Sequence, residues 1–88
     1  MSRGGPRITT ADGKKNGVGE RVRERRLELR MTQDRLSANL ARLTEGQWNP
    51  SIDEIHNLEV GRRLCGDLEL RVLARALETN VLWLMGEE

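Results

Sequence analysis

The stretch NPSIDEIHNLEVGRR, residues 49–63, carries the signals of a short helix with a defined start and a defined end. Ser51 and Glu54 fit a capping box, in which the serine side chain accepts a hydrogen bond from the backbone three residues on and the glutamate side chain reaches back. Gly61 suits the position after the last turn, where the chain often takes a left-handed conformation. The stretch therefore predicts a helix that begins at Pro50 or Ser51 and ends at Gly61.

This predicted helix has two different faces. With an advance of about 100° per residue, Ile55, Leu58 and Glu59 fall in one sector. The opposite sector holds Asp53, His56, Asn57 and Val60. We expect Ile55 and Leu58 to face the core. Glu59 then lies at the edge of the buried sector, where a carboxylate without a partner would be costly.

Helical signals continue on the N-terminal side of this stretch. Residues 18–30 have apolar positions at spacings of four and seven, namely Val18, Val22 and Leu29. Residues 31–43, MTQDRLSANLARL, begin with Thr32 as an N-cap and carry Asp34 in the first turn, where the helix dipole favours an acid. Their apolar stripe consists of Leu36, Leu40 and Leu43. Both segments are therefore predicted to be helices.

Two further helices are predicted on the C-terminal side. Asp67 is expected to cap the segment LELRVLARAL, residues 68–77, and Gly86 is expected to stop the short apolar segment NVLWLMG, residues 80–86. Together these signals predict an all-α domain of five helices over residues 17–88. Residues 1–16, MSRGGPRITTADGKKN, have too few apolar side chains to be buried, and we expect them to form a disordered basic arm. This arm either is an inert solvated tail or follows a phosphate backbone with its four basic residues, Arg3, Arg7, Lys14 and Lys15.

Composition limits the classes of function. A chain of 88 residues fits one small domain, and its net charge of +1 conceals an uneven distribution. Through Arg35 there are ten Lys/Arg and five Asp/Glu, or +5, whereas from Leu36 onward there are five and nine, or −4. The single cysteine, Cys65, cannot form an internal disulfide, and no apolar stretch approaches the length of a membrane span. We expect a soluble protein of the cytoplasm.

Three segments in order resemble a known family: VGERVRERRLELRMTQDRLS, IHNLEVGRR and DLELRVLARALETNVLWLMGE. Together they are similar to the phage-repressor (Cro/Xre-like) helix-turn-helix regulators of bacteria and phages. The resemblance covers residues 18 to 86. It implies a lambda-repressor-like fold and a sequence-specific, double-stranded-DNA-binding transcriptional regulator, expected to be a repressor that acts as a homodimer at the nucleoid.

The resemblance and the polar face of the helix at residues 51–60 together give a set of expected DNA contacts. These are Gln33, Ile52, Asp53, His56, Asn57, Arg62 and Arg63. Family members commonly contact the DNA backbone at the positions of Gln33, Arg62 and Arg63. Among base contacts, Asn57 can bond to adenine, His56 to a guanine edge or a phosphate, and Asp53 to a cytosine amino group. Two alternatives stay open, in which Asp53 is a surface acid favoured by the helix dipole and His56 a solvated side chain.

The resemblance also implies structural roles. The family's matching glutamate pairs with an arginine, so Glu59 is expected to pair with Arg26. Part of the C-terminal segment must close the core, and the remainder could form a two-fold interface, with Trp83, Leu84 and Met85 as possible dimer contacts. Trp48, in contrast, is expected to cover the core.

Catalysis and cofactors are not expected. One His and one Cys do not make a usual zinc site, and GKKNGVG lacks the ending of a phosphate-binding loop. We therefore expect a protein that is not an enzyme, with no metal, cofactor or small-molecule ligand. The alternative function is a protein-interaction module on the same fold, whose acidic second half binds a basic protein partner.

Overall fold

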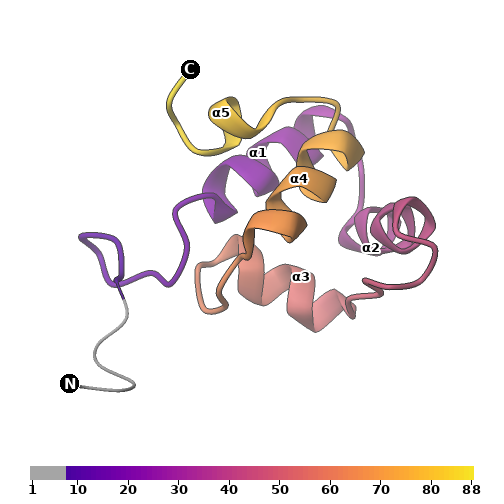
Figure 1. The fold of residues 1–88 in the computed structure, drawn as a ribbon, viewed down its shortest axis with the longest axis horizontal. Coiled ribbons are helices and arrows are strands. Elements are labelled where there is room, and N and C mark those ends of the chain that lie inside the picture. The colour runs from indigo at the N-terminus through magenta and orange to yellow at the C-terminus, as the bar shows by residue number, and fades with distance from the viewer. Residues whose placement is uncertain (1–7) are drawn as a thin grey trace.

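The computed structural model of the protein describes residues 8–88, which form five helices and no strand (Figure 1). In chain order the helices are α1 (Gly19–Glu28), α2 (Gln33–Leu43), α3 (Ile52–Glu59), α4 (Asp67–Ala76) and α5 (Val81–Leu84). The prediction of an all-α domain with five helices is confirmed. None of the helices in this part of the chain has the length and apolar character needed to cross a membrane.

A single aliphatic core joins all of the helices. Its fully buried side chains are Val22, Leu36, Leu40, Ile55, Leu58, Leu73, Leu77 and Leu84. Full burial of one such side chain contributes about 1.5–3 kcal/mol, so each helix is held mainly by what it places in this core. α3 contributes Ile55 and Leu58, which are 0% and 1% exposed. The inner face predicted for this helix is therefore confirmed.

The helix starts follow from local capping. Thr32 accepts a hydrogen bond from the backbone N–H of Arg35, and both bonds of the capping box between Ser51 and Glu54 are present, at 3.1 and 3.2 Å. One predicted start is wrong by a residue, because Gly66 and not Asp67 precedes α4. There Glu69 reaches back to accept from the backbone N–H of Gly66 at 3.1 Å.

The connection between α2 and α3 is packed against the rest of the domain. The Thr44 hydroxyl accepts a hydrogen bond from the backbone N–H of Trp48 at 2.9 Å, and the Ser37 hydroxyl donates to the carbonyl of Pro50. Trp48 packs against the core, as predicted. These contacts anchor the chain just before α3 begins.

Only part of the predicted arm, residues 8–16, lies within the described residues. Residues 1–7 lie outside the described part of the chain, but from Thr10 onward the backbone is hydrogen-bonded. Thr10 and Lys14 close a turn, in which the Thr10 N–H donates to the Lys14 carbonyl and the Thr10 hydroxyl accepts from the Lys14 N–H, both at 2.9 Å. Asn16 then begins the folded domain by accepting from the N–H groups of Val18 and Gly19 at 3.0 and 2.8 Å. The N-cap residue of α1 is Val18, so Asn16 orders the chain just before this helix through its side-chain oxygen.

Candidate nucleic-acid interface

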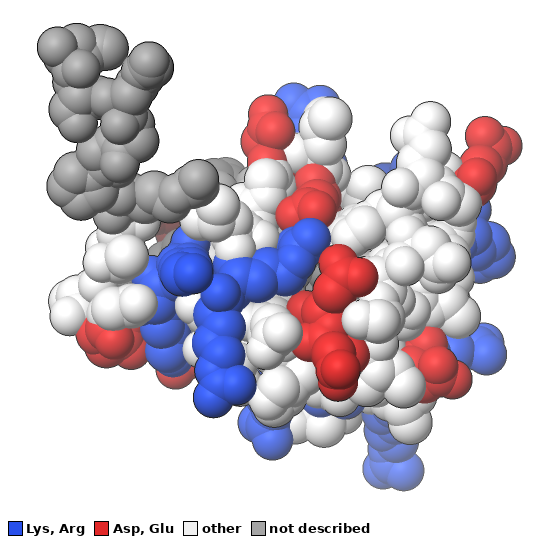
Figure 2. All heavy atoms as spheres, turned by 90° about the horizontal axis from the view of Figure 1, so that it is seen from below, with Lys and Arg blue, Asp and Glu red and all other residues white. Residues whose placement is uncertain are grey.

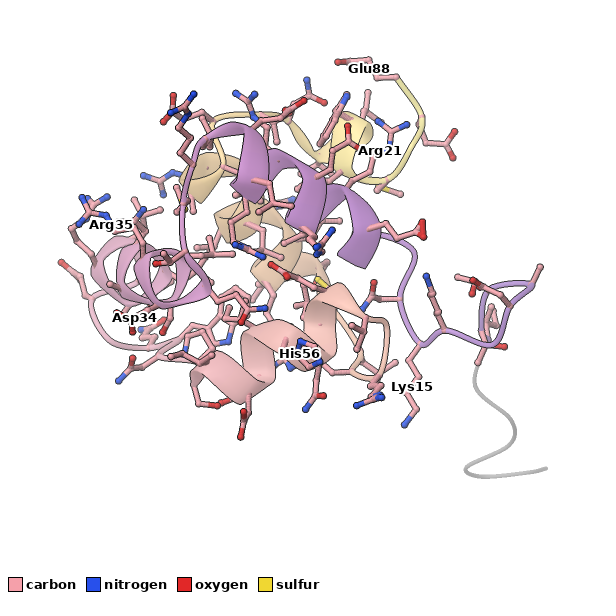
Figure 3. All side chains as sticks on the ribbon, turned by 180° about the vertical axis from the view of Figure 1, so that it is seen from behind. Lys15, Arg21, Asp34, Arg35, His56 and Glu88 are labelled. Carbon is pink, nitrogen blue, oxygen red and sulfur yellow. The ribbon has the colours of Figure 1, made fainter. Side chains whose placement is uncertain are left out.

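The outer surface of α3 presents polar side chains on a backbone that is fixed from beneath. Asp53 and His56 are exposed, Asn57 is half-buried, and Ile52 is 48% exposed at the first turn. In Figure 3 the His56 side chain lies in front of the α3 ribbon, on the side of the helix turned toward the viewer. Residues three or four apart share a helix face, so Asp53 and His56 lie on one face with Asn57 beside them.

A buried hydrogen-bond cluster holds the inner side of α3. Arg26 Nε donates to Glu59 Oε2 at 2.6 Å, and Arg26 Nη2 donates to Glu59 Oε1 at 3.1 Å. Gln33 Nε2 donates to Glu59 Oε1 at 3.1 Å, and Arg26 Nη1 donates to the carbonyl of Met31 at 2.8 Å. The side chains of Arg26 and Glu59 are only 9% and 1% exposed. The two residues predicted to pair are thus in contact, and they join α1, the start of α2 and the end of α3.

The position of Gln33 limits which of its amide hydrogens could contact a DNA phosphate. One hydrogen of its side-chain amide is used within the domain, by the bond to Glu59. An amide nitrogen carries two hydrogens, and the Gln33 side chain is not fully buried. A phosphate contact therefore depends on the second hydrogen of the same amide, in a side chain whose orientation is already set.

Arg62 and Arg63, which the sequence treats alike, have different surroundings. Arg63 donates to both carboxylate oxygens of Glu69 at 2.9 and 3.0 Å, lies 3.8 Å from a Glu54 oxygen, and stacks 5.7 Å from the centroid of the Trp48 ring. The hydrogen bond from Arg63 lowers the pKa of Glu69, and the same bond raises that of Arg63. Arg63 therefore joins α3 to α4, and its predicted phosphate contact stays a prediction. Arg62 is exposed and forms no ion pair within residues 8–88.

The two ends of α3 carry side chains of opposite charge. Asp53 and Glu54 lie in its first turn, whereas Arg62 follows its end and Lys15 donates a backbone hydrogen bond to Gly61 there. Figure 2 views this side of the molecule and shows Lys and Arg side chains gathered toward the N-terminal segment, with Asp and Glu side chains next to them. A polyanion would therefore be attracted to the C-terminal end of α3 and repelled at its start.

The C-terminal residues predicted to form a dimer contact fall into different environments. Leu84 is fully buried and belongs to the core, so the prediction is wrong for this residue. Met85 is 47% exposed, and Leu82, which the sequence analysis did not select, is 54% exposed. Trp83 is half-buried beneath the guanidinium group of Arg21, 4.7 Å from its ring centroid. A helix of four residues is too short for periodicity to show which leucine faces inward.

Groups that could carry other chemistry are few in the described part of the chain. Within residues 8–88, no three His, Cys, Asp or Glu side chains lie close enough to hold a metal ion. Burial, together with the nearby Glu69 carboxylate, raises the pKa of the Cys65 thiol to about 11. Cys65 is therefore a neutral thiol at physiological pH, whereas a thiol acts as a nucleophile only in its ionised form.

No protein-family model, curated protein or solved structure matches this chain. Its function is therefore inferred from the contacts, exposure and charge of the residues described above.

Proposed function

We propose that this protein is a helix-turn-helix transcriptional regulator with a lambda-repressor-like fold, which binds double-stranded DNA in a sequence-specific manner. In this proposal α2 lies across the DNA backbone and α3 enters the major groove. The protein acts in the cytoplasm at the nucleoid, most simply as a repressor that blocks a promoter. The observation that carries the proposal is the exposed polar face of α3, held from beneath by the cluster of Arg26, Glu59 and Gln33.

The outer face of α3 has side chains that match base edges. Asn57 can bond bidentately to adenine, His56 can donate to a guanine edge or a phosphate, and Asp53 can accept from a cytosine amino group. Ile52, half-exposed at the start of the helix, offers an apolar surface for a thymine methyl group. Arg62 supplies a phosphate contact just beyond the helix end. A good bidentate contact contributes about 1–3 kcal/mol of discrimination between bases.

Rigid placement of α3 supports this role. A recognition group must be held within about 0.5 Å of its productive position. α3 meets this need because one carboxylate, Glu59, accepts hydrogen bonds from side chains of both α1 and α2. The start of the helix is fixed separately by the capping box and by the packed connection from α2.

We further propose a homodimer formed through the C-terminal residues. Leu82 and Met85 leave apolar surface exposed at α5, and Trp83 borders it. Two copies related by a two-fold axis would present their α3 helices to half-sites about one helical turn of DNA apart. The bound sequence is then expected to be an inverted repeat.

Selection of bound duplexes from a random pool tests the proposal. We expect enrichment of a two-fold symmetric site, relaxed preference at one position in each half-site for Asn57→Ala, and weaker binding to all duplexes for Arg62→Ala. Arg75→Ala, which removes an exposed arginine from α4, is the matched control and should leave binding unchanged. If the wild-type protein retains no duplex even at low salt, DNA binding is rejected.

A second candidate function rests on the acids at the start of α3. Asp53 and Glu54 are exposed where a recognition helix usually meets the bases, and this charge favours a basic protein partner. Asp53→Asn separates the two functions. It should strengthen non-specific duplex binding if α3 faces DNA, because one repulsive charge is lost, and it should weaken capture of a basic partner if α3 faces protein.

A further inference from the structure

The C-terminal end of α3 is held by residues that precede α1. The Asn16 side-chain amide donates to the carbonyls of Leu58 and Arg63 at 3.0 and 2.8 Å. Its oxygen accepts from two backbone N–H groups at the start of α1. One side chain thus joins the beginning of α1 to the end of α3, across more than forty residues of sequence.

Lys14 and Lys15 extend this connection over Gly61. The Lys15 backbone N–H donates to the Gly61 carbonyl at 2.8 Å, and the Lys14 side chain lies so near that a Cβ on Gly61 would approach it to 2.7 Å. Gly61 has a φ of +83°. Position 61 therefore requires glycine for two reasons. Its backbone is left-handed, and a Cβ there would collide with the Lys14 side chain. We call residues 14–16 the strap.

The two lysines of the strap differ in their electrostatic surroundings. Lys14 Nζ lies 3.2 Å from Glu20 and 3.6 Å from Asp12, so its charge is balanced within the domain. Lys15 is exposed and forms no ion pair among the described residues. In Figure 3 the Lys15 side chain extends on the same side of the molecule as His56. The unpaired cation of the strap thus belongs to a residue bonded to the C-terminal end of α3.

We propose that the strap fixes the C-terminal end of α3 and presents Lys15 to the same phosphate backbone that Arg62 contacts. Lys15 is bonded through its backbone to Gly61, and Arg62 is the next residue in the chain. Both cationic residues therefore adjoin Gly61, at the end of α3 opposite to Asp53 and Glu54. Lys15 is the contact residue, and Asn16 is a positioning residue that acts through the backbone of α3. This inference rests on the proposed function and adds a phosphate contact to it.

Salt dependence of duplex binding measures the contact directly and requires no knowledge of the operator. Each neutralised phosphate contributes a slope of about −0.9 to the plot of log Kobs against log salt concentration. With a fluorescein-labelled pool of random duplexes, Lys15→Ala should reduce the magnitude of the slope by about 0.9 per protomer. Lys14→Ala is the matched control, and its slope should equal that of the wild type because its ammonium group is already paired.

Asn16→Asp tests the positioning role. The carboxylate keeps the oxygen that accepts from the Val18 and Gly19 N–H groups but replaces the amide donor, so both bonds to the end of α3 are lost. In the free protein, we expect faster hydrogen exchange of the Lys15 amide, with the helix content unchanged by circular dichroism. With duplex, the slope should fall toward that of Lys15→Ala. The conservative variant Asn16→Gln, which keeps a donor and an acceptor on a longer side chain, should restore part of both signals.

The outcomes separate the two proposals. Suppose that the wild type shows salt-dependent binding. If Lys15→Ala keeps the wild-type slope, or if Lys14→Ala lowers the slope as much as Lys15→Ala does, Lys15 is not a phosphate contact. The proposal of DNA binding is then unaffected. An unchanged exchange rate of the Lys15 amide in Asn16→Asp would overturn the positioning role. If the wild type binds no duplex at all, the proposed function fails and the phosphate contact fails with it.

Discussion

Removal of the buried charge at Glu59 should strongly destabilise the folded domain. In Glu59→Gln the volume is kept, but the guanidinium group of Arg26, whose side chain is 9% exposed, loses its counter-charge. Removal of one partner from a buried ion pair costs about 3–5 kcal/mol. In a domain of this size each kcal/mol lowers Tm by about 4–8 °C, so Tm should fall by at least about 12 °C.

Urea unfolding followed by far-ultraviolet circular dichroism measures this cost. The midpoint of the transition should fall while its slope with urea stays constant, because the buried surface changes little. The double variant Arg26→Met with Glu59→Leu is the control, since an apolar pair of similar volume is often as stable as the ion pair that it replaces. It should be more stable than either single variant. A decrease of less than about 1 kcal/mol in the free energy of unfolding of Glu59→Gln would contradict the value expected for a buried pair. It would mean that the cluster is hydrated and does not fix α3.

Three further predictions concern other parts of the fold. Gly19→Ala should lower Tm strongly, because its Cβ would approach the carbonyl oxygen of Leu58 to 2.3 Å, whereas Gly17→Ala, whose Cβ would meet only a methyl group at 4.0 Å, should not. Cys65, with a pKa of about 11, should react with a thiol reagent at pH 8 far more slowly than free cysteine, and reaction at an equal rate would show that it is exposed. The hydrogen bond from Arg63 lowers the pKa of Glu69 below the ordinary value of 4.5. The ionised Glu69 therefore stabilises the fold above pH 4.5, and this contribution is lost as the pH falls through the lowered pKa. Urea unfolding at a series of acidic pH values should therefore show a weaker pH dependence for Glu69→Gln than for the wild type.

The elements that sequence predicted well are those whose signals are local. Thr32 and the pair Ser51 and Glu54 act on backbone groups within three residues, so their spacing alone placed the starts of α2 and α3. The same holds for Gly61, whose positive φ follows directly from the end of the helix. The inner face of α3 was predictable because eight helical residues, in the structure Ile52–Glu59, are enough to define two sectors.

The site was harder to predict because its remaining contacts join distant segments. Asn16 bonds to carbonyls at and just beyond the C-terminal end of α3, and backbone carbonyls carry no sequence signature. Arg63 was indistinguishable from Arg62 until packing placed Glu69 and Trp48 beside it. Composition also gave no sign that Lys14 and Asn16 contact the rest of the domain through an ion pair and hydrogen bonds.

The arrangement of the two tryptophans gives the protein separate optical reporters for its two surfaces. The chain has no tyrosine or phenylalanine, so Trp48 and Trp83 alone account for its fluorescence. Trp48 lies in the connection that leads into α3, and Trp83 lies in α5 beside the exposed apolar residues. In Trp83→Leu the remaining emission would follow events near α3, such as addition of a duplex. In Trp48→Leu it would follow self-association on concentration, so binding and assembly can be observed independently in an unlabelled molecule.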